Sequence, residues 1–146
     1  MDDVDQRLVA ALRLNGRASY AELARLVGLS GPAVHERINK LETSGVIQGY
    51  HAAVAPEALG KTMSALIGVF ISDTGDSEAI AADLQAVPPV EDCWFVAGEE
   101  TFVVKVSVPD VSGLEEVIRA INGIAGIART RTTVVLSTKF EGRLRA

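Results

Sequence analysis

The chain has 146 residues, of which 48% are hydrophobic and 23% charged, and this balance excludes a disordered protein and supports one or two small cores. The net charge of −5 argues against a general binder of polyanions, and the single cysteine excludes a disulfide or a thiolate zinc cluster within one chain. The longest apolar run, residues 63–71, is far shorter than a membrane span, so we expect a cytoplasmic protein that does not enter the membrane.

The first fifty residues are predicted to form three short helices. Residues 3–14 repeat apolar side chains at helical spacing: Val4, Leu8, Ala11 and Leu12. Ser19 and Glu22 have the S-x-x-E spacing of a capping box, so a second helix is expected to begin near Tyr20. Gly28 is placed to end this helix in a left-handed conformation.

A third helix is predicted between Ser30, which is a second candidate N-cap, and Gly45. Its buried stripe consists of Val34, Ile38 and Leu41. Two helices joined by a glycine turn are typical of a helix-turn-helix, whose second helix enters the major groove of DNA. Residues 46–54 are rich in β-forming residues and are expected to form a short wing or connecting strand.

The predicted DNA-binding residues occupy the N-terminus and the outward side of the third helix, together with two arginines that precede it. They are Ser30, Gly31, Ala33, His35, Glu36, Arg37, Lys40, Arg17 and Arg25. Acidic and basic residues balance within residues 1–50, so DNA affinity must come from local clustering and from assembly of several copies. Arg37 either reaches a guanine or braces the fold against Glu42 or Asp5, and the sequence leaves both open.

After a turn-rich break at residues 56–60, the periodicity changes to alternating strands and helices. The predicted order is strand 64–71, helix 77–87, strand 91–97, strand 101–108, helix 111–121 and strand 128–136. This βαββαβ order is ferredoxin-like, with an antiparallel sheet and both helices on one face. The other face is available for a partner subunit. Cys93, beside Trp94, is expected to be buried.

Several short motifs along the chain resemble the Lrp/AsnC, or feast/famine, family of transcription regulators. The motifs are Val4-Asp5, Leu8, Asn15-Gly16-Arg17, Leu23-Ala24, Val27-Gly28-Leu29-Ser30, Val34, Arg37-Ile38, Leu41-Glu42, Gly45, Ile47 and Gly49-Tyr50. The resemblance continues through Leu59-Gly60, Gly98, Lys105-Val106 and the strand that contains residues 129–132. It implies an α+β chain with a winged-type helix-turn-helix domain (1–54), a hinge (55–62) and a ferredoxin-like, RAM/ACT-like sensing and oligomerisation domain (63–146).

The resemblance also implies a free amino acid as effector, bound at the subunit interface of a homodimer that assembles further, into an octamer. The implied effector residues are Gly98, Glu99, Glu100, Thr101, Thr130 and Thr132. The family's loop pattern is Gly-x-Tyr-Asp, whereas this chain has Thr101 in place of the aspartate, so either Glu100 substitutes or the effector preference differs. The alternative is that Glu99 and Glu100 form only a solvated turn.

No residues have the spacing of a nucleophile, base and orienter, so we expect no enzyme, no catalytic residue, no metal and no cofactor. The sequence therefore predicts a transcription regulator that binds double-stranded DNA and responds to an amino acid. Two alternatives stay open: an architectural, nucleoid-type DNA-binding protein without effector sensing, and a stand-alone amino-acid-binding module.

Overall fold

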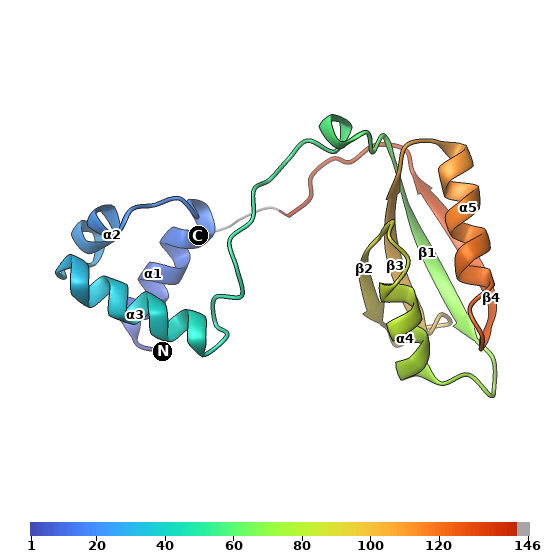
Figure 1. Ribbon diagram of the computed structural model, residues 1–146, viewed down its shortest axis with the longest axis horizontal. Helices are drawn as coiled ribbons and strands as arrows, with labels where there is room; N and C mark the ends of the chain where they lie inside the picture. Colours follow the sequence, from blue (N-terminus) through green and yellow to red (C-terminus); the bar gives the residue numbers. More distant parts are fainter. Residues whose placement is uncertain (143–146) are drawn as a thin grey trace. The chain divides into compact units, whose positions relative to one another are not determined.

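The computed structural model describes residues 1–142, and residues 1–53 and 54–139 form two separate units. The first unit contains three helices, labelled in Figure 1: α1 (Asp3–Leu14), α2 (Tyr20–Val27) and α3 (Gly31–Thr43). The three predicted helices are thereby confirmed.

The helix ends follow from local capping chemistry. Ser19 and Glu22 form the predicted capping box at the start of α2, and Gly28 ends the helix with a φ of +74°. Only glycine adopts this left-handed conformation at little cost, so Gly28 permits the sharp turn into α3. A second capping box, between Asp2 and Asp5, begins α1.

A small apolar core holds the three helices together. Its buried members are Leu8 from α1, Leu23 and Ala24 from α2, and Val34 and Ile38 from α3. The guanidinium of Arg7 also donates a hydrogen bond to the carbonyl of Leu26, near the end of α2. The outer surface of α3 is therefore left for contacts with another molecule.

The predicted wing is wrong. Residues 46–54 form no strand, and the first strand of the described chain begins at Met63. Gly45 and Gly49 both have positive φ values, +75° and +158°, and a strand forms only where a partner strand supplies its hydrogen bonds. No neighbouring strand exists within residues 1–53.

The second unit has the predicted βαββαβ order. After a short 3-10 turn (Pro56–Leu59) come β1 (Met63–Ile71), α4 (Ser77–Gln85), β2 (Val90–Phe95), β3 (Phe102–Val108), α5 (Val111–Asn122) and β4 (Ile127–Val135). The sheet order is β2-β3-β1-β4, and all pairs are antiparallel. The ferredoxin-like prediction is confirmed.

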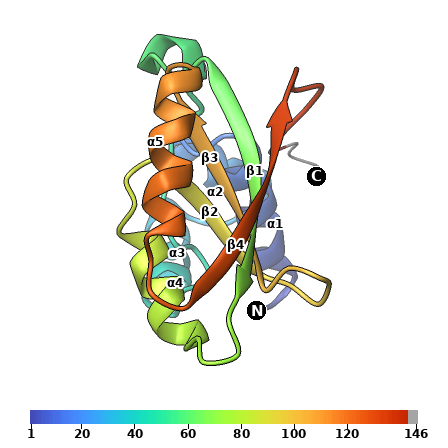
Figure 2. The same ribbon diagram turned by 90° about the vertical axis from the view of Figure 1, so that its right-hand side faces the viewer.

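Both helices cover one face of the sheet (Figure 2). This helix-covered face carries a core in which Ile67, Val69, Phe102, Val104 and Val106 pack against Leu84 of α4 and Ile121 of α5. The strand register places six other residues together on the opposite face: Leu66, Gly68, Val103, Lys105, Arg131 and Thr133. No helix within residues 54–139 covers this second face, which we call the open face.

Cys93 is exposed, so its predicted burial is wrong. It lies on the edge strand β2, where every residue after Val90 is exposed. No helix of the described residues is both long and apolar enough to cross a membrane. Among residues 1–142 no group of acidic, histidine or cysteine side chains is arranged to hold a metal ion.

Candidate DNA-binding helix and effector site

The N-terminus of α3 is open and positively polarised. Ser30 is the N-cap, and its hydroxyl accepts a hydrogen bond from the amide of Ala33 at 3.4 Å. A side chain added at Gly31 would meet nothing within 4 Å. The remaining free amides of the first turn, together with the helix dipole, favour a phosphate at this position.

Two charged side chains on the outward side of α3 form an ion pair with each other. Lys40 contacts Glu36 one turn away at 2.8 Å, and both side chains are largely exposed. The hydrogen bond from Lys40 lowers the pKa of Glu36, which therefore stays ionised. The ring of His35 packs against that of Tyr20 from α2, with ring centres 4.8 Å apart. His35 is thereby oriented by α2.

Arg37 is engaged by the start of α1. Its Nη1 lies 2.7 Å from a carboxylate oxygen of Asp2 and 2.8 Å from one of Asp5. Hydrogen bonds from the amide of Asp5 and from Arg37 lower the pKa of Asp2, so the contact remains ionic. Of the two roles that the sequence left open for Arg37, this conformation corresponds to bracing, with Asp2 as an additional partner.

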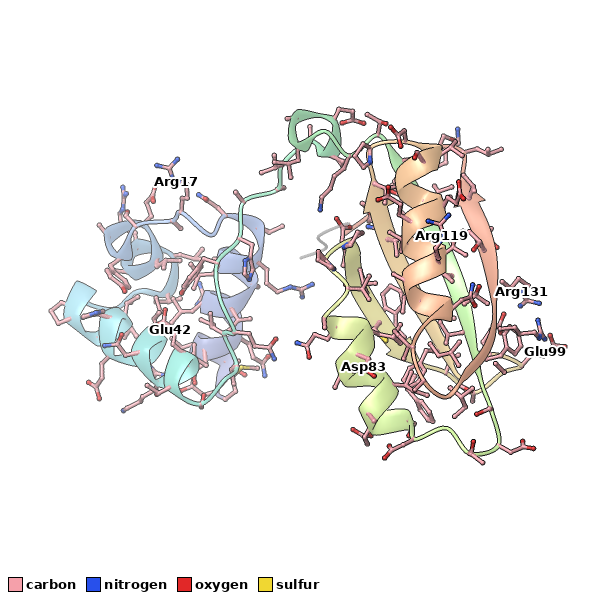
Figure 3. The ribbon with its side chains drawn as sticks, turned by 45° about the vertical axis from the view of Figure 1, so that its right-hand side comes forward. Arg17, Glu42, Asp83, Glu99, Arg119 and Arg131 are labelled. Atoms are coloured by element: carbon pink, nitrogen blue, oxygen red, sulfur yellow. The ribbon has the colours of Figure 1, made fainter. Side chains whose placement is uncertain are left out.

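Arg17 and Arg25 present cations near α2. The Arg17 side chain projects away from the helices (Figure 3), and no carboxylate within residues 1–142 pairs with it. The Nε of Arg25 donates only to the carbonyl of Ala21 in its own helix, at 3.3 Å. Both guanidinium groups are therefore available for phosphates.

In the second unit, the loop after β2 folds back over the open face. The amide of Thr101 donates to the carbonyl of Val69 at 2.9 Å, which holds the loop against β1. The Glu100 side chain then lies over Gly68 and forms an ion pair with Arg131, whose exposed fraction is 55% against 16% for Glu100. Glu99 lies 3.6 Å from the same guanidinium, and Figure 3 shows the two side chains near each other.

The predicted threonines share one face, but it is the other face of the sheet. Thr130 pairs with Val69 and Thr132 with Ile67, and both partners belong to the helix-covered core. The hydroxyl of Thr130 accepts a hydrogen bond from Asn122 at the end of α5, at 3.1 Å. One chain therefore does not bring the predicted loop residues and the predicted threonines together.

Sequence reasoning missed the two residues that position Glu100. Gly68 provides the space, because a Cβ there would lie 2.6 Å from the Cγ of Glu100. Arg131 provides the countercharge from the strand position opposite Gly68. The signals were present as a glycine in the middle of an apolar strand and as arginines alternating with threonines along residues 129–132.

Comparison with known proteins identifies the two units. Residues 1–42 match an AsnC-type helix-turn-helix domain, and residues 64–144 match an Lrp/AsnC ligand binding domain. The chain belongs to the Lrp/AsnC family.

Relatives match over nearly the whole length. The HTH-type transcriptional regulator LrpA of Mycobacterium tuberculosis is 40% identical over 143 residues, covering 98% of this chain and 95% of the relative. Regulatory protein AsnC of Escherichia coli is 31% identical over 137 residues, covering 93% and 90%. This Lrp/AsnC protein is accordingly a helix-turn-helix transcriptional regulator, and its family consists of regulators and not of enzymes.

Solved structures of related regulators have the same fold as this chain. The feast or famine regulatory protein of M. tuberculosis, complexed with L-methionine, has a TM-score of 0.92 at 40% identity and covers 99% of this chain and 97% of its own. A Neisseria meningitidis transcriptional regulator, also in complex with L-methionine, has a TM-score of 0.90 at 25% identity and covers 100% and 96%. The α+β Lrp/AsnC fold is thereby confirmed.

Proposed function

We propose that this Lrp/AsnC regulator binds double-stranded DNA sequence-specifically through α3, and that a free amino acid bound between copies of the chain changes this binding. The observation that carries the effector proposal is the Glu100–Arg131 pair over Gly68. Two relatives of known structure were crystallised with L-methionine, which supports an amino acid as the ligand class.

The chemistry of the pair matches a zwitterion. Glu100 can accept hydrogen bonds from an α-ammonium group, and Arg131 can donate two parallel hydrogen bonds to an α-carboxylate. Gly98 leaves the backbone of the loop open, since a Cβ added there would meet an oxygen of Glu100 only at ordinary van der Waals distance, 3.8 Å. Gly98, Glu99, Glu100 and Thr101 therefore form the loop half of the proposed site.

The separation of the loop from the threonines supports a site completed by a neighbouring copy. Thr130 and Thr132 lie on the opposite face from Glu100 within one chain. A second chain that brings its threonines to this loop would enclose the ligand. We propose a homodimer built on the open face, where Leu66 and Trp94 are 38% and 48% exposed, and assembly of dimers into an octamer, in which a neighbouring dimer supplies the threonines from its helix-covered face.

On the DNA side, we propose that the N-terminus of α3 approaches the major groove with Ser30, Gly31, Ala33 and His35. Arg17 and Arg25 then contact phosphates. Glu36 and Lys40, which pair with each other, lie on the same outward side, where an acidic group would restrict the sequence to bases that donate a hydrogen bond.

The link between the two functions is proposed to run through the hinge, residues 55–62, between a DNA-binding domain (1–54) and a sensing domain (63–146). Lys61, in the hinge, contacts Glu91 of β2 at 2.8 Å, and Glu91 also accepts a hydrogen bond from Ser107 at 3.0 Å. Glu91 occupies a β-bulge opposite Val106 and Lys105, which turns its side chain to this contact. A rearrangement of the sheet assembly would therefore move the C-terminal end of the hinge, which is the linkage required for allosteric control.

The proposal is tested by capture of genomic DNA. Purified protein is mixed with fragmented genomic DNA at physiological salt, with and without the twenty amino acids, and the bound DNA is sequenced. Discrete sites whose occupancy changes with amino acids are expected. Discrete sites that do not respond would overturn the effector proposal and favour an architectural protein, and no enrichment would overturn DNA binding and favour a stand-alone ligand-binding module.

A further inference from the structure

The strongest feature outside the effector site is the set of contacts that joins the start of α1 to the middle of α3. Asp2 and Asp5 accept hydrogen bonds from one nitrogen of Arg37, at 2.7 and 2.8 Å. Asp5 is only 18% exposed at its side chain, and Arg37 is 33% exposed. We call these three residues the Asp2–Asp5–Arg37 clamp.

The clamp is built into the backbone of α1. Asp2 is the N-cap of that helix and accepts from the amide of Asp5, while Asp5 accepts from the amide of Asp2 at 3.2 Å. Both carboxylates are thus oriented before they meet Arg37. An arginine held by two oriented carboxylates has little freedom to reach a base, and releasing it would leave the partly buried Asp5 charge unpaired.

We propose that Arg37 is a positioning residue which sets the orientation of the recognition helix α3 against α1, and that it does not itself recognise a base. This inference rests on the proposed DNA-binding function. Its consequence is that α3 contacts bases through its N-terminal residues and His35, with its angle set by an ion-pair clamp on the side of the helix that faces α1.

Two substitutions separate positioning from direct contact. Arg37→Met removes the guanidinium, and Asp5→Asn removes a carboxylate charge but keeps an acceptor for the amide of Asp2. The matched control is Asp3→Asn, which removes a carboxylate charge in the same first turn of α1. The DNA probe is the duplex that the wild-type full chain selects most strongly from a random-sequence library, compared with a scrambled duplex.

Both clamp variants are expected to lose at least one base contact, or about tenfold in affinity for the selected duplex. Their affinity for the scrambled duplex should stay within about twofold of wild type, since phosphate contacts are intact. The double variant should bind no more weakly than either single variant, because both remove the same clamp. Asp3→Asn removes the same negative charge as Asp5→Asn and should leave DNA binding unchanged or slightly stronger, because it weakens repulsion from the phosphates. Weaker binding by Asp5→Asn would therefore not be a general effect of net charge.

Three results would overturn the clamp. If Arg37→Met weakens binding but Asp5→Asn does not, Arg37 contacts a base. If Arg37→Met lowers the slope of log affinity against log salt by about 0.9, Arg37 contacts a phosphate. If both variants melt at lower temperature but keep the wild-type preference for the selected duplex when fully folded, the clamp serves the fold alone. A wild-type chain that selects no duplex would instead refute the proposed DNA-binding function.

Discussion

Gly68 lies on the open face, and adding one methyl group there is expected to move Glu100 away from Arg131. A Cβ at Gly68 would lie 2.6 Å from the Cγ of Glu100 and 3.0 Å from its Oε1, well inside the favourable separation of about 3.5–4.0 Å between carbon atoms. Gly68 does not have a positive φ, so the backbone accepts alanine. The Glu100 side chain must therefore give way.

Gly68→Ala is expected to change the free energy of unfolding much less than the free energy of effector binding. Alanine in a strand is favoured over glycine by about 0.5–1 kcal/mol, and a pair in which Arg131 is 55% exposed contributes no more than about 1 kcal/mol. The free energy of unfolding should therefore change little in Gly68→Ala. Effector binding loses a charge-assisted hydrogen bond worth about 1.5–3 kcal/mol, which corresponds to a dissociation constant about 10- to 100-fold higher.

Isothermal titration calorimetry measures this loss, with the amino acid that most raises the melting temperature of the wild-type chain in a screen of all twenty. Glu100→Ala should show a similar loss, and Gly68→Ala should cost nothing further in the Glu100→Ala background. If the double variant binds much more weakly than Glu100→Ala, the added methyl acts on packing between copies. Wild-type affinity in Gly68→Ala would refute the role assigned to Glu100.

Three further predictions concern single contacts. Ser30→Ala removes the acceptor for the first-turn amide of α3 and should lower the free energy of unfolding by about 1 kcal/mol; denaturant titration checks this, and Ser30→Asp should restore it. Tyr50 is 48% exposed, and its hydroxyl donates a hydrogen bond to Glu42; partial burial first, and Glu42 second, raise the pKa of this hydroxyl from 10.0 to about 12. The Tyr50–Glu42 hydrogen bond therefore contributes fully to folding stability below pH 10, and this contribution is lost as pH rises through 12. In an ultraviolet titration, Tyr50→Phe should lack one late tyrosinate step that the wild-type chain shows. The pKa of Glu91 is lowered, first by its hydrogen bond from Lys61. The contribution of Glu91 to folding stability is therefore present above the ordinary carboxyl pKa and is lost as pH falls through the lowered value. Lys61→Met should make the free energy of unfolding less sensitive to acid, which unfolding measured at a series of pH values checks.

The helical unit was predictable because its signals are local. Ser19, Glu22 and Gly28 act within one or two turns of their own positions, and the helix ends follow from them. The capping box between Asp2 and Asp5 follows the same chemistry, although the sequence pattern there is less distinctive. Boundaries set by neighbouring residues are the part of a fold that one sequence carries most directly.

The two errors both concern what lies beside a predicted strand. Residues 46–54 contain β-forming residues, but a strand needs a partner, and the sequence does not tell whether one is near. Cys93 was predicted to be buried from its apolar surroundings, yet β2 is the outermost strand on its side of the sheet and its residues are exposed. Burial in a sheet depends on strand order, which is a tertiary property.

The candidate effector residues show a further limit. Alternation along residues 129–132 correctly predicts that Thr130 and Thr132 share a face, but the register with β1 decides which face that is. Pairing of Gly68 with Arg131 places the arginines on the open face and the threonines on the covered one. A shift of one residue would exchange them, so the separation of the two halves of the site could not be predicted from the strand alone.

Charge pairing in the helical unit has a consequence for how the regulator binds DNA. Arg37 is held by Asp2 and Asp5, Lys40 pairs with Glu36, and Arg7 binds the carbonyl of Leu26. Few cations of one DNA-binding domain therefore remain for phosphates, and a single domain should bind DNA weakly, with a shallow dependence of its affinity on salt. Linking several weakly binding domains raises their joint affinity by orders of magnitude only where their spacing lets them bind DNA together. An effector that alters the assembly would thus control DNA affinity through the spacing of the DNA-binding domains, without contacting a residue of α3.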